Sequence, residues 1–174
     1  MDIKRKPKHI IVENGIYFIT THTQGFLPIF RNKELIEKLY QNIIKVQKET
    51  SFSLFAYVIL LNHIHLMFQI TKQNILSKIM FRIKGRSARE INKLRGIKGK
   101  AVWQDRYMDH LIRDDHDFQN HLDYIHYNPV RHKLVKKPEN WPWSSYLKFV
   151  RRGYYEIGWG HKELTTKSNF NYEH

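Results

Sequence analysis

β-Branched and aromatic residues gather in three short runs of the chain, a pattern that predicts three β-strands. These runs cover residues 16–23, 53–61 and 63–70. Only Asn62 separates the second run from the third. Strands joined by so short a turn must run antiparallel, so an antiparallel sheet is expected.

Apolar residues recur at helical spacing in other parts of the chain. Helices are predicted over about 33–49, where Asn32 can serve as the N-cap, and over about 73–94. A third helix is expected to begin near Asp114 and to end at Pro129, because the residue before a proline resists helical geometry.

The order of these elements is strand, helix, strand, strand and helix, followed by an extended or irregular segment over 102–113 and by the third helix. An α+β fold is therefore predicted, with a small antiparallel sheet and helices packed on one face. A ferredoxin-like arrangement is the natural candidate for this order. The 174 residues suffice for one domain with a hydrophobic core and are too few for two.

The composition points to an anionic partner. The chain has 30 Lys and Arg against 16 Asp and Glu, a net charge of +14 that is spread along its length. A nucleic acid is the simplest polyanion to expect, although a ribosomal or merely basic protein is an alternative. The absence of cysteine excludes disulfides, thiolate zinc sites and cysteine nucleophiles. No apolar run reaches the roughly 18 residues of a membrane span, and the basic start lacks a signal-peptide core, so a cytoplasmic protein without membrane contact is expected.

His63-Ile64-His65 is the first candidate for chemistry. Side chains on a strand alternate between its faces, so the two histidines point the same way, roughly 6.6 Å apart along the strand. Such a pair can hold a metal ion. The alternative is two sheet histidines whose ring nitrogens are satisfied by structural hydrogen bonds.

The third helix supplies the second candidate. Its core stripe is formed by Phe118, Leu122 and Ile125, and Tyr124 lies about 100° to one side of the stripe with Asn128 four residues further on. A tyrosine hydroxyl can attack phosphorus and form a covalent link. A divalent ion held by two imidazoles and an amide oxygen would polarise the phosphate, and mixed ligands with open positions suit Mg²⁺ or Mn²⁺ better than a closed structural zinc site. No general base is evident.

At this point the residues carry a family resemblance. Asn62-His63-Ile64-His65 resembles the His-hydrophobe-His motif of the single-tyrosine HUH (IS200-like) transposases. The run His-Leu-Asp-Tyr-Ile-His-Tyr-Asn-Pro-Val over 121–130, followed by Trp-Pro-Trp-Ser-Ser-Tyr over 141–146, resembles the signature of the bacterial REP-associated tyrosine transposases. The resemblance covers roughly residues 10–150.

The resemblance implies a ferredoxin-like catalytic domain over residues 1–150, with residues 151–174 as a C-terminal extension of unknown role. It implies a nuclease and strand transferase acting on single-stranded or hairpin DNA, in which Tyr124 forms a 5′-phosphotyrosine and frees a 3′-hydroxyl. It also implies that His63 and His65 ligate the metal. Asn128 matches the third ligand position, where other single-tyrosine transposases carry the longer glutamine.

Basic residues form two candidate surfaces for DNA. Cations recur every three or four residues along the second helix, and others follow the third helix, where they could contact phosphates without reading sequence. They are Lys78, Arg82, Arg86, Arg89, Lys93, Arg131 and Lys133. A solvated charged face is the alternative for the second helix. Trp141 and Trp143 either stack on bases or pin the C-terminal segment to the domain.

Two other functions are consistent with parts of this pattern. A non-catalytic hairpin-binding regulator would explain the charge but has no need of the His, His and Tyr set. A replication-initiator or relaxase nickase would share the chemistry. The sequence leaves open whether the protein is a monomer or a homodimer, and which DNA sequence it binds.

Overall fold

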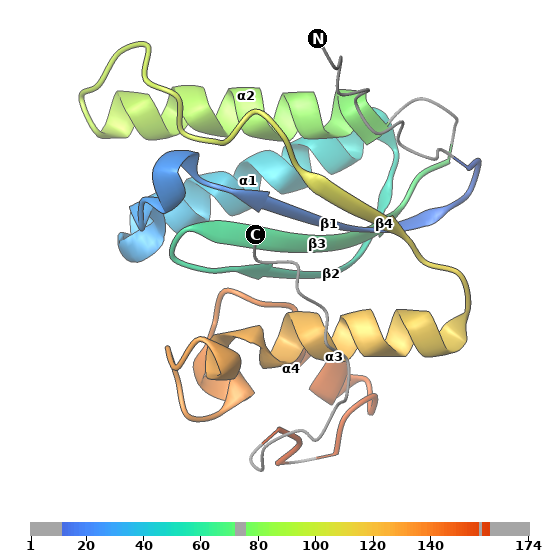
Figure 1. Cartoon of the computed structure of the whole chain (residues 1–174). Helices are drawn as coiled ribbons and strands as arrows, with labels where there is room; N and C mark the ends of the chain where they lie inside the picture. Colours follow the sequence, from blue (N-terminus) through green and yellow to red (C-terminus); the bar gives the residue numbers. More distant parts are fainter. Residues whose placement is uncertain (1–11, 72–75, 157, 161–174) are drawn as a thin grey trace, which may run out of the picture.

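A computed structural model describes residues 12–71, 76–156 and 158–160. Its centre is a four-stranded antiparallel sheet of order β2-β3-β1-β4 (Figure 1). The strands are β1 (Ile16–His22), β2 (Ser53–Ile59), β3 (His63–Gln69) and β4 (Met108–Leu111). The first three are the predicted strands, and β4 lies in the segment that was expected to be extended or irregular.

Within the described residues, four α-helices accompany the sheet. They are α1 (Lys33–Thr50), α2 (Leu76–Leu94), α3 (Asp115–Arg131) and α4 (Tyr146–Arg151). Short 3₁₀ turns occur at Gln24–Phe26, Ile29–Arg31 and Pro138–Asn140. The order from β1 to β4, with α1 and α2 as crossovers, is the predicted ferredoxin-like order. The first residues of the predicted second helix, 73–75, lie outside the described part of the chain.

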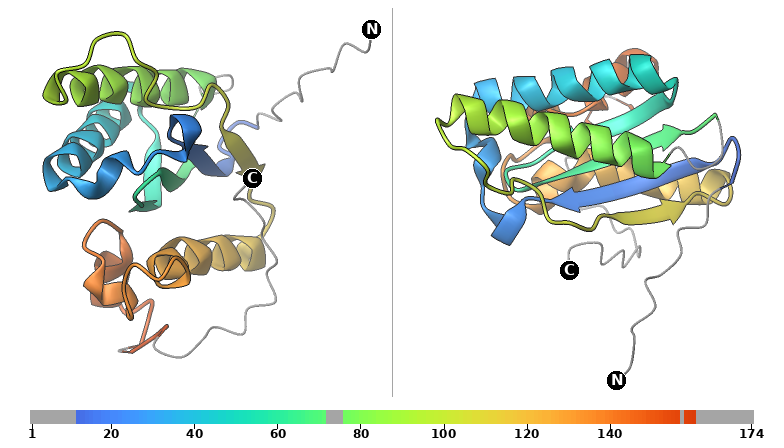
Figure 2. Two further views of the ribbon diagram at one scale, coloured as in Figure 1. Left: turned by 60° about the vertical axis from the view of Figure 1, so that its left-hand side comes forward. Right: turned by 90° about the horizontal axis from the view of Figure 1, so that it is seen from above.

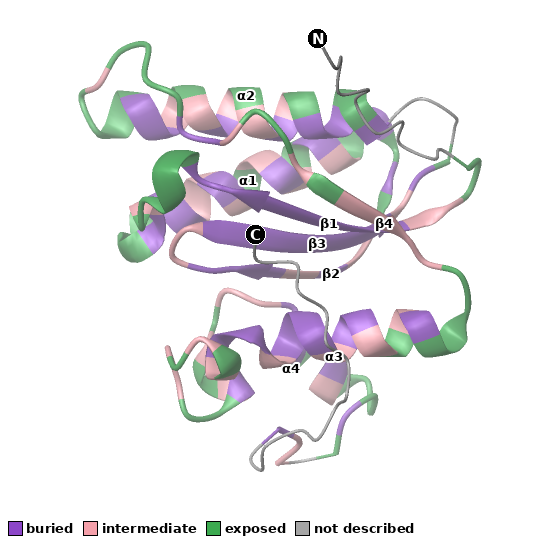
Figure 3. Cartoon of the chain, in the orientation of Figure 1, coloured by how far each residue is buried: buried purple, intermediate pink, exposed green. Residues whose placement is uncertain are grey.

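The helices cover both faces of the sheet, as Figures 1 and 2 show. The α+β class and the antiparallel sheet are confirmed, but the expectation of helices on one face holds only for α1 and α2. One core lies between these helices and alternate residues of the sheet such as Ile19, Ile64 and Leu66. The intervening residues, such as Phe18 and Met67, form a second core with α3 and α4. Figure 3 shows the resulting burial of β1 and β3 between two helical layers. The period of two places apolar residues on both faces of these strands, so both faces require a cover.

The N-terminal ends of α1 and α3 are set by their N-cap residues. The Asn32 side chain accepts a hydrogen bond from the backbone of Glu34 at 2.8 Å, and Asp114 caps α3 by accepting from Asp117 at 2.8 Å. The predicted end of α3 at Pro129 is wrong, because the helix continues to Arg131. Proline lacks one backbone donor, yet its fixed φ is helical, so one missing hydrogen bond near a helix end is tolerated.

The segment after α3 runs along the outer edge of the sheet, beside β2. The carbonyl of Trp143 accepts from the backbone of Ile59 at 2.9 Å, and the indole of Trp141 donates to the Ile59 carbonyl at 3.0 Å. Ser145 donates its backbone N–H to Tyr57 at 3.0 Å. The two tryptophans therefore hold this segment against β2, which agrees with their predicted structural role.

Of the predicted extension over 151–174, residues 161–174 lie outside the described part. None of the described helices is long and apolar enough to cross a bilayer.

Candidate active site on the third-helix face of the sheet

The strand register brings four polar side chains of β1 and β3 onto the sheet face that α3 covers. His63 lies opposite His22, and His65 lies opposite Thr20. His63 and His65 are both buried, with 3% and 0% of their surfaces exposed. The two rings are 4.9 Å apart between centroids. The predicted orientation of the histidine pair toward one face is thus observed, and that face is the one beneath α3.

Hydrogen bonds on one side of each ring fix its orientation. His63 Nδ1 lies 2.7 Å from Asn62 Oδ1, and His65 Nδ1 lies 2.8 Å from Thr20 Oγ1. The Asn62 amide nitrogen donates to the carbonyl of Phe26 at 3.2 Å, so its oxygen faces His63 and accepts a proton from Nδ1. The opposite nitrogen, Nε2, is buried without a hydrogen-bond partner in both histidines. A ring with Nδ1–H hydrogen bonded and Nε2 unoccupied is the arrangement typical of a histidine metal ligand.

Both imidazoles are held neutral. Burial, together with the neighbouring His132 and His22, lowers the pKa of His63 to about 3. Burial and the adjacent His63 lower the pKa of His65 well below its usual value. At neutral pH each ring therefore keeps one lone pair, as metal binding requires, and in His63 it lies on Nε2 because Nδ1 donates to Asn62 Oδ1.

Asn128 is fully buried, although the early end predicted for α3 would have left it at a frayed terminus. It lies one helical turn from Tyr124 and one from His132. Because Tyr124 contacts His65 and His132 contacts His63, the position between them faces the histidine pair. Neither Oδ1 nor Nδ2 of Asn128 has a hydrogen-bond partner. Leaving such a group unsatisfied costs about 1–3 kcal/mol. A cation coordinated by Nε2 of His63, Nε2 of His65 and Oδ1 of Asn128 would give each of these three buried atoms a partner. The residues present therefore fit a metal ion.

Tyr124 lies between the histidine pair and a cation. Its ring meets His65 edge-on at 5.2 Å between centroids, and Phe18 at 5.8 Å. The guanidinium carbon of Arg131 lies 5.3 Å from the ring centroid. A cation at that distance is attracted to the face of an aromatic ring and would also stabilise negative charge on the hydroxyl. Tyr127, by contrast, is half-buried and packs on Trp159.

His22 and His132 also belong to this site, and reasoning from the sequence missed both. His22 ends β1 and His132 follows α3, and the centroid of each ring lies 5.0 Å from that of His63. His22 shares the alternation of Phe18 and Thr20, but its position opposite His63 depends on the register between β1 and β3. His132 follows Asn128 by four residues, a spacing that could have suggested it. A depression of about 240 Å³ lined by His63, His132 and Leu134, among others, opens beside them.

The predicted DNA-binding residues fall on two different layers. Arg131 is the last residue of α3 and lies over the ring of Tyr124, and Lys133 follows two residues later, beyond the helix. The cations of α2 belong to the helical layer across the sheet from Tyr124 (Figure 1). Two of them pair with Glu49 of α1, Arg82 at 3.3 Å and Arg86 at 2.7 Å. These two cations are therefore already paired with a carboxylate of the same helical layer.

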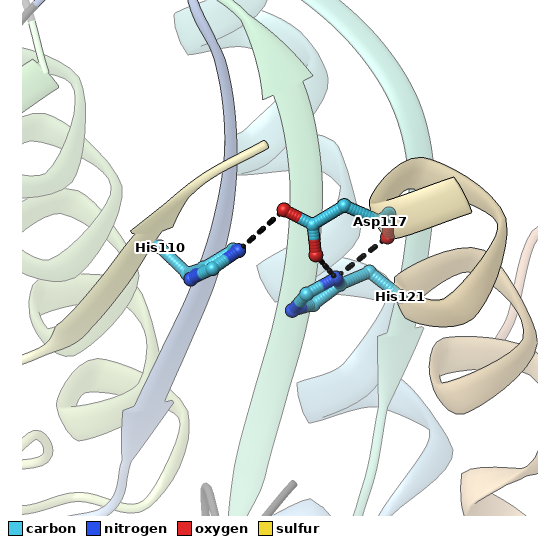
Figure 4. A group of neighbouring side chains, drawn as sticks. All are labelled: His110, Asp117 and His121. Carbon is cyan, nitrogen blue, oxygen red and sulfur yellow. Dashed lines mark hydrogen bonds and ion pairs between the residues drawn. The ribbon is translucent and has the colours of Figure 1, made fainter. Parts of the chain in front are cut away.

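Two histidines of α3, His121 and His126, are fully buried, whereas His116 of the same helix is exposed. His126 lies 2.8 Å from Ser145 Oγ and 2.9 Å from the hydroxyl of Tyr155, so it joins α3 to the C-terminal segment. Burial lowers the pKa of His126 to about 3, which keeps the ring neutral. His121 belongs to a separate group with His110 and Asp117 (Figure 4).

Comparison with known proteins agrees with this geometry. A family model described as "Transposase IS200 like" matches residues 16–128. A protein of Escherichia coli K12 named REP-associated tyrosine transposase is 31% identical over 153 residues, which are 85% of this chain and 86% of that protein. A Haemophilus influenzae protein whose name places it in the same group is 34% identical over 161 residues, 85% of this chain and 89% of that protein.

A solved structure agrees over most of the fold. It is described as a REP-associated tyrosine transposase bound to a REP hairpin, and it superposes with a TM-score of 0.76 at 27% identity, covering 92% of this chain and 94% of that one. The region matched by the family model runs from the first residue of β1 to Asn128, and so it includes His63, His65 and Tyr124. The chain therefore belongs to the REP-associated tyrosine transposases, within the IS200-like transposase family.

Proposed function

We propose that this transposase is a metal-dependent single-strand DNA endonuclease and strand transferase that acts on hairpin DNA through a 5′-phosphotyrosine at Tyr124. The observation that carries the proposal is the pair of buried, unpartnered Nε2 atoms on His63 and His65 beside the ring of Tyr124. Two neutral imidazoles with unused lone pairs have little structural purpose, because each is a buried polar group without a partner.

The metal would be held by His63, His65 and Asn128, with Mg²⁺ and Mn²⁺ as the expected ions. When bound, such an ion polarises the scissile phosphate and stabilises the charge that develops on its oxygens. The chain's own contribution is orientation: Thr20 and Asn62 hold the two rings, and α3 holds the amide one turn from the nucleophile.

The covalent step uses the hydroxyl of Tyr124. Its oxygen forms a bond to phosphorus while the bond from phosphorus to the 3′-oxygen breaks. The phenolic proton passes to water, and the leaving 3′-oxygen takes up a proton to become a 3′-hydroxyl. The phosphotyrosine keeps the energy of the broken phosphodiester, so a second 3′-hydroxyl can reverse the step and join a new strand without ATP.

Arg131 would assist this step through its guanidinium, which lies over the ring of Tyr124. Its guanidinium lies close enough to attract the developing negative charge on the Tyr124 oxygen, and its fork of donors suits a phosphate. Lys133, two residues later, would extend the positive surface along the bound strand. The hairpin substrate is inferred from the related structure, which is described as bound to a REP hairpin, and from the net charge of +14.

A labelled single-stranded hairpin tests the proposal directly. With Mg²⁺ or Mn²⁺ we expect a covalent adduct that survives denaturing electrophoresis and disappears when the ion is chelated. Tyr124→Phe should abolish the adduct, and His63→Ala should reduce it severely. Tyr127→Phe is the matched control, because this tyrosine of the same helix packs on Trp159. Undiminished adduct from Tyr124→Phe protein would refute the assignment of the nucleophile. Tight hairpin binding with no adduct on any substrate would instead indicate a non-catalytic regulator.

A further inference from the structure

A second group of metal-ligand side chains lies on β4 and on the first two turns of α3. It consists of His110 from β4 and of Asp117 and His121 from α3, and we call it the β4–α3 cluster (Figure 4). We propose that the β4–α3 cluster is a second metal site, which binds a zinc-class ion and fastens β4 to α3.

The donor atoms already converge. His110 Nε2 lies 2.8 Å from Asp117 Oδ2, and His121 Nδ1 lies 3.1 Å from Asp117 Oδ1. One ligand atom from each residue lies within 4.8 Å of both others. In a tetrahedral zinc site with bonds near 2.0–2.1 Å, neighbouring ligand atoms are about 3.3 Å apart. Both short separations lie within about 0.5 Å of that value. The His110 and His121 rings are stacked, 4.5 Å apart between centroids and 19° from parallel, so one ring must turn for both lone pairs to meet one ion.

The ligand types favour zinc, cobalt or nickel over magnesium. Two imidazoles and one carboxylate form the donor set, and imidazole suits the later transition metals whereas Mg²⁺ prefers oxygen. Asp117 and His121 are buried, with 4% and 0% of their surfaces exposed. His110 lies on an edge strand and leaves 25% of its side chain exposed. This is the side from which an ion and a fourth ligand, such as water, can arrive.

The charge states are compatible with metal binding. Although burial alone would raise the pKa of Asp117, hydrogen bonds from His110 and Arg113 outweigh it, and the pKa is lowered. Burial lowers the pKa of His121. The carboxylate is thus ionised and the buried imidazole neutral at pH 7.

Several interactions within the cluster must change when an ion binds. His121 Nδ1 lies 2.8 Å from the Asp117 carbonyl, which in an α-helix is also the acceptor for the backbone N–H of His121. That carbonyl keeps a donor when Nδ1 turns to the ion. The Arg113 side chain contacts Asp117 Oδ2 through Nε at 3.3 Å, but it is 73% exposed and can turn into solvent. The backbone N–H of Arg113 donates to the same oxygen at 3.1 Å and can remain, because a carboxylate oxygen has more than one lone pair. Where a nitrogen of a neutral ring changes from donor to ligand, the ring proton moves to its other nitrogen.

The cluster is separate from the proposed catalytic metal site but touches the same aromatic ring. Phe18 lies 4.8 Å from His121, 5.3 Å from His65 and 5.8 Å from Tyr124 between centroids. An ion in the cluster would therefore fix the start of α3 relative to the sheet. The same helix carries Tyr124 two turns later, so the ion would stabilise the position of the nucleophile.

The test is metal titration of the full-length protein with the first site removed. In a His63→Ala, His65→Ala variant we expect one equivalent of Co²⁺ to bind with visible d–d absorption, Zn²⁺ to displace it, and Zn²⁺ to raise the melting temperature. Adding His110→Gln or Asp117→Asn should remove this binding. His116→Gln and Asp115→Asn are matched controls, because both residues are exposed on the same turns of α3 outside the cluster, and both should retain it.

Circular dichroism of each variant establishes that it is folded. If Asp117→Asn does not fold, His110→Gln decides the question, since its edge-strand position is partly exposed. The proposal is overturned if the double variant binds neither Co²⁺ nor Zn²⁺, or if His110→Gln binds them as tightly as its parent. Because the readout uses neither DNA nor Tyr124, it is independent of the hairpin adduct.

Discussion

Replacing Thr20 by valine tests whether His65 acts as an oriented metal ligand. Valine has nearly the same shape as threonine but removes the hydroxyl that lies 2.8 Å from His65 Nδ1. The buried Nδ1 then has no hydrogen-bond partner, at a cost of about 1–3 kcal/mol. Loss of such an orienting partner typically weakens metal binding by about 10- to 100-fold, or roughly 1.4–2.7 kcal/mol.

The assay is hairpin adduct formation measured over a range of Mn²⁺ concentrations. For Thr20→Val we expect the half-saturating Mn²⁺ concentration to rise about tenfold or more. The maximal rate should be largely recovered at high Mn²⁺, because the ligand itself is still present.

Thr21→Val is a matched control for this experiment. Thr21 is the next residue of the same strand and is equally buried, but it faces the α1–α2 side and its hydroxyl has no hydrogen-bond partner. Its substitution should leave the Mn²⁺ dependence unchanged. The reasoning is refuted if both variants shift the half-saturating concentration equally. It is also refuted if Thr20→Val lowers the maximal rate without changing that concentration.

Three further predictions concern the surroundings of the site. Arg131→Gln should slow adduct formation by about 2- to 30-fold in single-turnover assays, since a cation over an aromatic ring contributes about 0.5–2 kcal/mol. Lys133→Gln should weaken hairpin binding and lower the slope of log affinity against log salt by about one, as measured by fluorescence anisotropy. Arg86→Gln should change the slope less, because Glu49 already engages that guanidinium at 2.7 Å. Trp141→Phe removes the hydrogen bond to the β2 edge, and urea unfolding should show a loss of about 1 kcal/mol.

The secondary structure was largely predictable from the sequence. The run of β-branched and aromatic residues over 16–23 and the helical spacing over 33–49 are local patterns, and β1 and α1 match them to within one residue. The end of α3 was predicted wrongly because proline was taken to end the helix. It removes only one donor there, and Leu134 and His132 complete the end through the carbonyls of Pro129 and Asn128.

The placement of the helices was less predictable. Phe18 and Ile19 are adjacent, strongly apolar residues that point to opposite faces, so the sequence contained evidence of a sheet buried on both sides. Which helix covers which face depends on the path of the chain between elements. That path is not encoded in any short periodic pattern.

The sequence by itself determined which chemical groups the site can use: two histidines of one strand face, a tyrosine and an amide one turn apart, and no thiol. These follow from residue identity and from the fixed periods of strands and helices. Only the tertiary structure decided that His22 and His132 flank His63, that Asn128 is buried, and that His110 meets Asp117 and His121. Each of these contacts joins different elements or buries a side chain between them. Strand register and helix packing set them, and both are products of the whole core rather than of any local segment.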